Sequence, residues 1–117
     1  MKPGIESVMR VLSLRRLPLE DEKQTQNAIA EVFDEHFDCW EREKRIAGGI
    51  IDFVVFGEVG VEVKIKGAPR EIHRQLERYA QEPALRTLLL VSSKPVSLPA
   101  TMSGKLVMQF HLGRAWL

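Results

Sequence analysis

Residues 50–66 have the sequence IIDFVVFGEVGVEVKIK, two runs of strand-forming residues joined by a short turn that contains glycine. The first run, residues 50–56, is rich in β-branched and aromatic residues on both faces, which predicts a strand inside a sheet. The second run, residues 61–66, alternates strictly, so that Glu62, Lys64 and Lys66 share one face. The stretch therefore predicts a β-hairpin that carries charged side chains within a sheet.

These charged side chains need partners. Asp52 interrupts an apolar strand, and a buried carboxylate without a partner is costly and tends to take up a proton. Glu62 and Lys64 create the same problem on the next strand. Two explanations remain open: Lys64 forms an ion pair with one of the acids, or the acids bind a hard cation such as Mg²⁺, which prefers oxygen ligands.

The register of the hairpin decides whether the two acids meet. Asp52 and Glu62 are equidistant from Gly57, so a symmetrical loop about Gly57 places them opposite each other on one face, with Cβ atoms ~5 Å apart. A four-residue loop over residues 57–60 would put them on opposite faces unless a bulge restores the phase. Both registers are compatible with the sequence.

Around the hairpin, helical and extended patterns alternate. We expect helices at residues 3–16, 21–36 and 69–82, strands at 37–43, 87–91 and 105–112, and a loop over 92–104. The strand at 87–91 follows a helical crossover, so it should run parallel to the strand at 61–66, and the last strand should lie at an edge. The predicted fold class is α/β: one domain over residues 1–117, with its core at about 20–112 and helices flanking a mixed central sheet.

Composition narrows the class of protein further. The chain has 117 residues, 44% of them hydrophobic, which suits one packed domain. Cys39 is the only cysteine and His36, His73 and His111 lie far apart, so neither a disulfide within the chain nor a zinc site is expected. No apolar run has the length of a signal peptide or a membrane span, which favours a cytoplasmic location and no contact with a membrane.

The charge is distributed unevenly although the net charge is only +1. Residues 20–43 contain nine acidic and two basic residues, whereas residues 64–78 contain five basic and two acidic ones. Two such flanks can orient a polyanion, but two solvated helix faces are the simpler interpretation of charge alone. The basic flank includes the helical series Arg70, Arg74 and Arg78, and Lys66 next to the charged strand face. These residues are candidates for contact with a phosphate backbone.

The acidic helix presents one carboxylate to the core. Glu22 lies seven residues before Ile29 and falls on the same apolar stripe, with Gln26 close to it. Glu22 either points toward the sheet or only stabilises the first turn of the helix through the helix dipole. On the last helix, Gln75 flanks the apolar stripe and could bind backbone at the edge of the sheet.

The pattern D-x9-E-x-K, set in this hairpin and followed by a helix with Gln75, resembles the PD-(D/E)xK nuclease superfamily over about residues 22–91. VRR-NUC domains and small Holliday-junction resolvases are the most similar members. The resemblance implies a restriction-endonuclease-like αβββαβ core. Ile51 stands where the family has a proline before the aspartate, which mildly weakens the match.

The resemblance also implies roles for individual residues. Asp52 and Glu62 would bind Mg²⁺ or Mn²⁺, helped by the backbone carbonyl of Val63, and Lys64 would serve hydrolysis. Two further family positions match Glu22, which would reach the metal through water, and Gln75. DNA contacts are expected from Lys66, Arg70, Arg74, Arg78 and Gln26.

Together these features predict a Mg²⁺-dependent DNA endonuclease, with branched or flapped DNA as candidate substrates. Two alternatives stay open: a catalytically inactive nucleic-acid-binding module with the nuclease fold, and a structural domain in which Lys64 pairs with an acid. Because a domain this small has little surface for gripping a junction, and because small resolvases are dimers, a C2 homodimer is expected. The N-terminal helix and the pair Trp116 and Leu117 are its candidate contacts.

Overall fold

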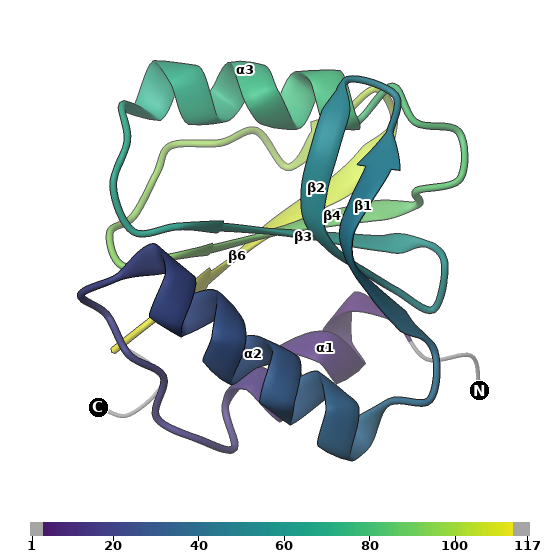
Figure 1. Ribbon diagram of the computed structural model, residues 1–117. Helices are drawn as coiled ribbons and strands as arrows, with labels where there is room; N and C mark the ends of the chain where they lie inside the picture. The colour runs from purple at the N-terminus through teal and green to yellow at the C-terminus, as the bar shows by residue number, and fades with distance from the viewer. Residues whose placement is uncertain (1–3, 114–117) are drawn as a thin grey trace.

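The structure, a computed structural model, describes residues 4–113. The helices are α1 (Ile5–Leu12), α2 (Glu22–His36) and α3 (Pro69–Tyr79), and the strands are β1 (Trp40–Ile46), β2 (Gly49–Val55), β3 (Val59–Lys64), β4 (Thr87–Ser92), β5 (Thr101–Met102) and β6 (Lys105–His111). The strands form one six-stranded mixed sheet in the order β1-β2-β3-β4-β6-β5, with helices on both faces (Figure 1). The predicted α/β class with a mixed central sheet is confirmed.

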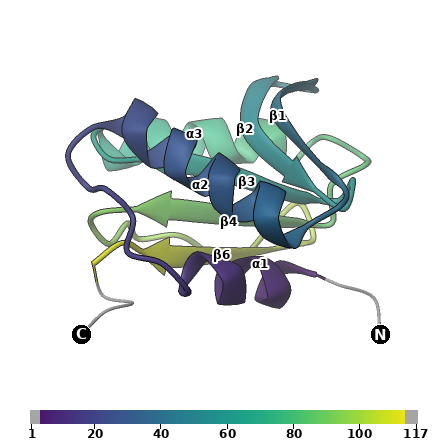
Figure 2. The same cartoon turned by 60° about the horizontal axis from the view of Figure 1, so that its bottom comes forward.

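Each face of the sheet carries its own apolar core. On one face, α1 and α2 pack against the sheet through buried side chains such as Val8, Phe33 and Val61. On the other face, α3 packs against the sheet through residues such as Leu76 and Leu88. In Figure 2, α1 lies beside β6 while the β1–β2 hairpin projects at the opposite end of the sheet. No helix within residues 4–113 is long and apolar enough to cross a membrane.

Local sequence explains where α2 and α3 begin. Asp21 is the N-cap of α2, and its carboxylate accepts hydrogen bonds from the backbone N–H groups of Lys23 (2.8 Å) and Gln24 (3.4 Å). Pro69 is the first residue of α3, where a missing N–H costs nothing. The helix α3 connects β3 to β4, which pair in parallel as predicted.

Several predicted boundaries are wrong. The first helix ends at Leu12 instead of residue 16, because the Ser13 hydroxyl bonds the Arg10 carbonyl (2.6 Å) and the chain turns there. The helix α3 ends at Tyr79 instead of residue 82, because the next residues form i→i+3 turns. The strand β1 begins at Trp40 instead of residue 37, since residues 37–39 carry the chain out of α2.

The far edge of the sheet also differs from the prediction. The two-residue strand β5, expected to be part of a loop, pairs with Leu106 and Lys105 at the start of β6. It therefore takes the edge position that we expected for β6. The strand β3 begins at Val59 instead of residue 61 and ends at Lys64 instead of residue 66, so Lys66 lies beyond the strand. Gly60 belongs to the strand, where an added Cβ would lie 2.8 Å from Ile51 and 3.0 Å from Leu88. Gly60 thus allows close packing instead of forming a turn.

The β1–β2 hairpin bends sharply in its middle. Glu43 has a positive φ of 53°, and the backbone pairing of β1 with β2 skips Glu43 and Asp52. Side-chain alternation breaks at the same place, because Ile51 packs in the core under α3 whereas Phe53 packs in the opposite core. Figure 1 shows the outer half of the hairpin turning toward α3. This half of the hairpin leaves the plane of the sheet and separates from β3.

Candidate active site

Asp52 and Glu62 face each other at the point where β2 and β3 separate. The backbone pairing of these strands runs from Val55 and Val59 to Phe53 and Val61, which is symmetrical about Gly57. The symmetrical register is therefore confirmed, and the alternative four-residue loop is wrong.

Beyond the last backbone pair of β2 and β3, the two carboxylates link the strands through side-chain hydrogen bonds. Glu62 Oε1 accepts a hydrogen bond from the Asp52 backbone N–H (3.1 Å), and Asp52 Oδ2 accepts one from the Val63 backbone N–H (2.8 Å). Each acid is thus anchored on the strand that carries the other. The reciprocal arrangement fixes the two carboxylates side by side on one face, as the metal hypothesis requires.

Lys64 completes the group. Its Nζ lies 3.2 Å from Glu62 Oε2, and the side chain of Lys64 is 22% exposed whereas that of Glu62 is 3% exposed. The ion pair considered from the sequence is therefore present, with Glu62 as the acid. Because the Lys64 side chain is partly exposed, it links the buried Glu62 to the surface of the molecule.

Burial and mutual repulsion change the acidity of the pair. Burial, together with the charge of Asp52, raises the pKa of Glu62 to about 8, although Lys64 opposes the shift. Burial also raises the pKa of Asp52, against the hydrogen bond from Val63 and the charge of Lys64. The pair therefore tends to hold a proton near neutral pH, and a cation placed between the carboxylates would replace that proton.

Glu22 approaches the site from α2 but does not join the pair. Its Oε1 accepts a hydrogen bond from the backbone N–H of Ile65 (3.0 Å), directly beyond the end of β3. Of the two positions considered for Glu22, the structure shows the one that points toward the sheet, and Glu22 also lies in the first turn of α2. Within residues 4–113, no three His, Cys, Asp or Glu side chains come together as a metal-binding group. Gln26, one turn further along α2, is half-buried.

Tyr79 and Gln75 hold the outer half of the hairpin against α3. The Tyr79 hydroxyl donates to the Ile50 carbonyl (2.7 Å) and accepts from Gln75 Nε2 (2.9 Å). Gly48 packs so closely on α3 that an added Cβ would lie 2.8 Å from the Arg78 carbonyl oxygen. Burial raises the pKa of Tyr79, which keeps its proton as a donor. We did not single out Tyr79 from the sequence, because it lies on the apolar stripe of α3.

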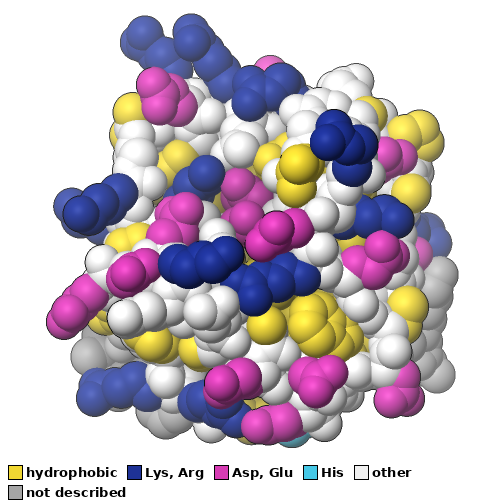
Figure 3. All heavy atoms as spheres, viewed as in Figure 1, with side chains coloured by type: hydrophobic (Ala, Val, Ile, Leu, Met, Phe, Trp, Pro, Cys, Tyr) yellow, Lys and Arg dark blue, Asp and Glu magenta, His cyan; other side chains and the backbone are white. Residues whose placement is uncertain are grey.

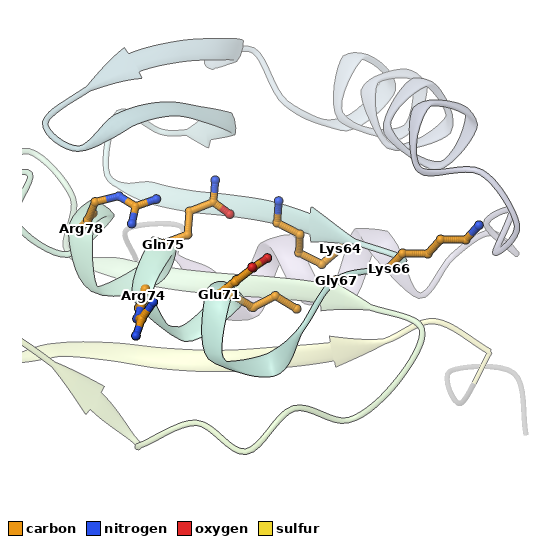
Figure 4. Close-up of a pocket in the computed structure, with 8 residues that line it drawn as sticks. Lys64, Lys66, Gly67, Glu71, Arg74, Gln75 and Arg78 are labelled. Atoms are coloured by element: carbon orange, nitrogen blue, oxygen red, sulfur yellow. The ribbon is translucent and has the colours of Figure 1, made fainter.

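A basic cavity of about 400 Å³, the site cavity, opens beside Lys64 (Figure 4). Its lining comprises Lys64, Lys66, Gly67, Glu71, Ile72, Arg74, Gln75 and Arg78. In Figure 4 the side chains of Lys64 and Gln75 point to the same side, toward the β1–β2 hairpin. Of the three arginines predicted to contact DNA, Arg74 and Arg78 line this cavity, whereas Arg70 is exposed and lies outside its lining.

The surface around the site is divided into acidic and basic areas, as the uneven distribution of charge along the sequence suggests. Figure 3 shows acidic side chains gathered at the centre of the face between α2 and α3, with lysine and arginine side chains around them. One basic residue that we did not predict is Arg42, which donates to Asn27 Oδ1 (2.8 Å) and stacks 5.8 Å from the centre of the Phe53 ring. It sits among acidic residues in the sequence, and only the β1–α2 packing reveals its fixed position.

Comparisons of this chain with protein families, with characterised proteins and with solved structures give no significant match. The functional argument therefore depends on the geometry of the site.

Proposed function

We propose that this domain is a metal-dependent endonuclease that hydrolyses phosphodiester bonds in DNA. One observation carries the proposal: Asp52 and Glu62 lie side by side with Lys64 where two strands part, next to a basic cavity. Glu62 is buried and Asp52 is half-buried, and two adjacent carboxylates in such surroundings repel each other unless a proton or a cation lies between them. A basic cavity beside such a pair suits a phosphodiester, because it attracts the phosphate that the acids alone would repel.

The donor set fits Mg²⁺ or Mn²⁺. Asp52 and Glu62 offer hard oxygen ligands, and Mg²⁺ typically needs only one or two carboxylates because it keeps several of its waters. We expect the Val63 carbonyl to contribute as well, with Glu22 acting through water. Such an ion supplies Lewis-acid polarisation of the phosphate and activation of water.

The residues of the chain divide the remaining tasks. With Glu62 committed to the cation, the Lys64 ammonium can turn to a phosphate oxygen and offset charge that develops in the transition state. Lys66, Arg74 and Arg78 hold the phosphates on either side of the reacting one. Arg70 and Gln26 extend this contact along α3 and α2. Gln75 acts through Tyr79, which fixes the half of β2 that leads into Asp52.

A second candidate function is a nucleic-acid-binding module without catalysis. The observation that favours it is the network of contacts in which both acids already bind backbone amides and Glu62 pairs with Lys64. These contacts compensate the charges without a metal.

A cleavage assay separates the two functions. Linear, nicked, flapped and four-way DNA would be incubated with the protein in Mg²⁺ and, separately, in chelator. The nuclease predicts cleavage in Mg²⁺ alone and its loss in Asp52→Asn, which keeps the shape of the side chain. Binding of DNA without cleavage of any substrate, in Mg²⁺ or Mn²⁺, would establish the second function instead.

We also propose a C2 homodimer, since two copies would be needed to engage both arms of a branched substrate. The N-terminal helix remains a candidate contact, whereas Trp116 and Leu117 lie outside the described residues. Light scattering should report twice the chain mass at micromolar concentration. A monomer with and without DNA would refute the dimer.

A further inference from the structure

A second cavity, of about 330 Å³, lies at the carboxyl ends of the parallel strands β3 and β4, and we name it the strand-end cavity. Its lining comprises Lys64, Ile65, Lys66, Gly67, Pro69, Ile72, Ser92, Lys94, Pro95 and Val96. Four of these residues, Lys64, Lys66, Gly67 and Ile72, also line the site cavity. The two cavities are therefore neighbours that share the lysine of the proposed active site.

The strand-end cavity combines an apolar wall with cationic residues. Pro69, Ile72, Pro95 and Val96 provide flat or branched apolar surface, and Ile72 and Val96 are largely buried, at 5% and 8% exposed. Lys66 and Lys94 are exposed lysines that contribute to its lining. No acidic residue is among the lining residues. This chemistry differs from that of the site cavity, where Glu71 and two arginines take part.

Hydrogen bonds fix the loop that forms one wall. The Ser92 hydroxyl donates to the Lys94 carbonyl (2.7 Å), and the Ser93 hydroxyl donates to the Ile65 carbonyl (3.1 Å). The Val96 backbone N–H donates to Gln109 Oε1 (3.0 Å). The loop after β4 is thus tied to the residue that follows β3 and to β6, so the cavity is a preformed feature of the fold.

We propose that the strand-end cavity receives an unpaired nucleobase of the strand that passes Lys64, so that the substrate is single-stranded next to the cut. This inference rests on the proposed function, because it takes the ligand to be a nucleic-acid strand. A nucleobase has apolar faces that suit the proline and isoleucine wall, and its flanking phosphates suit Lys66 and Lys94. The cavity volume lies at the lower end of the range for small-ligand sites.

The geometry selects an unpaired base over a duplex. A base within a duplex is stacked and paired, so it enters a cavity only if it is extruded, which costs a few kcal/mol. A base in a single strand or a flap avoids most of that cost. Because every base has an apolar face that the proline and isoleucine wall can contact, the cavity should show little preference among the bases.

The first test needs no variant. Binding of a short fluorescent DNA strand and of its blunt duplex would be compared by anisotropy in chelator, where cleavage is absent. The single strand should bind about tenfold more tightly, a difference of ~1.4 kcal/mol. A single abasic position moved along a strand of defined register should weaken binding about tenfold at one position only. Equal affinity for strand and duplex, or a flat abasic scan, would overturn the proposal.

Variants then locate the effect. Val96→Phe fills the cavity, so the loss of affinity at one abasic position should disappear. Leu98→Phe lies in the same loop but outside the lining, so it should keep that loss. Lys94→Ala should weaken binding of the single strand more than Lys23→Ala, an exposed lysine on α2. Equal effects of Lys94→Ala and Lys23→Ala would contradict the proposal. If Val96→Phe does not fold, the abasic scan of the wild type together with Lys94→Ala decides.

Failure of this inference can be distinguished from failure of the proposed function. The wild type could prefer single strands and lose affinity at one abasic position, yet never cut DNA in Mg²⁺. That result would support the nucleobase site and refute the nuclease. Cleavage in Mg²⁺ together with a flat abasic scan would support the nuclease and refute the nucleobase site.

Discussion

The two halves of β3 are held in different ways. From Val59 to Val61 the strand pairs through its backbone with β2 on one side and with β4 on the other. From Glu62 to Lys64 the backbone pairing with β4 continues, but the link to β2 consists of carboxylate side chains. Backbone pairing persists whatever the charge state, whereas carboxylate links depend on protons and cations. The stability of the half of β3 from Glu62 to Lys64 therefore depends on charge, whereas that of the half from Val59 to Val61 does not.

The largest expected effect that distinguishes the two halves of β3 is the pH dependence of the free energy of unfolding. Burial raises the pKa of Glu62 from its ordinary 4.5 to about 8, so the folded protein keeps a proton that the unfolded chain releases. This contribution to stability is complete below pH 4.5 and is lost as the pH rises through about 8. The free energy of unfolding should fall by up to about 5 kcal/mol across that window.

Urea melts in chelator at a series of pH values would measure this loss. Glu62→Gln, which carries no titrating group, should flatten the profile between pH 4.5 and 8. A profile in Glu62→Gln that still falls as steeply as that of the wild type would show that another group is responsible.

Lys64→Ala should separate catalysis from stability. If Lys64 acts as proposed, removing the ammonium deletes a transition-state contact worth ~2.7–4 kcal/mol, so cleavage should slow about a hundredfold or more. Stability should change little at neutral pH, because Glu62 can hold a proton once Lys64 is gone. Cleavage kinetics and a thermal melt on the same variant would check both expectations.

A purely structural ion pair predicts the opposite pattern. Truncating Lys64 would then strand a buried charge and cost ~3–5 kcal/mol of stability. Lys66→Ala is the matched control, since Lys66 is an exposed lysine close to Lys64 in the sequence. It should weaken DNA binding slightly and leave the melt unchanged.

The half of β3 from Val59 to Val61 should respond without regard to charge. Val61 is fully buried among α2 and the sheet, so Val61→Ala should cost about 2 kcal/mol through lost burial and a cavity. That loss should be the same at pH 5 and pH 8, and with or without Mg²⁺. A loss that changed with pH would show that the two halves of β3 are not independent.

The smallest expected effect is on the anchor of the hairpin. Tyr79→Phe keeps the ring but removes the hydroxyl that bonds Ile50 and Gln75, which should cost about 1 kcal/mol. Hydrogen exchange should speed up at the outer half of β2 and stay unchanged at Val59 and Val61. Uniform acceleration across the sheet would contradict the role assigned to this anchor.

The sequence predicted the features that depend on periodicity. The equal spacing of Asp52 and Glu62 from Gly57 made the observed register one of two alternatives, and the stripe of α2 did the same for the inward position of Glu22. The crossover rule led to the parallel pairing of β3 with β4. These features follow from local repeats, which a single sequence displays directly.

The features that depend on tertiary packing were missed. The bend of the hairpin rests on a positive φ at Glu43, a residue type with no strong preference for that conformation. Gly60 was placed in a turn, because its need for close packing comes from Leu88, far along the chain. Likewise, the choice of Glu62 over Asp52 as partner of Lys64 depends on how β2 and β3 diverge.

The central claim is that Asp52 and Glu62 form a divalent-cation site, and calorimetric titration with Mn²⁺ tests it most directly. We expect the wild type to bind Mn²⁺ more tightly as the pH rises toward 8, with release of a proton, and to melt at a higher temperature in its presence. Asp52→Asn should lose this binding while keeping its fold. Absence of Mn²⁺ binding in the wild type, or equal binding in Asp52→Asn, would contradict the claim.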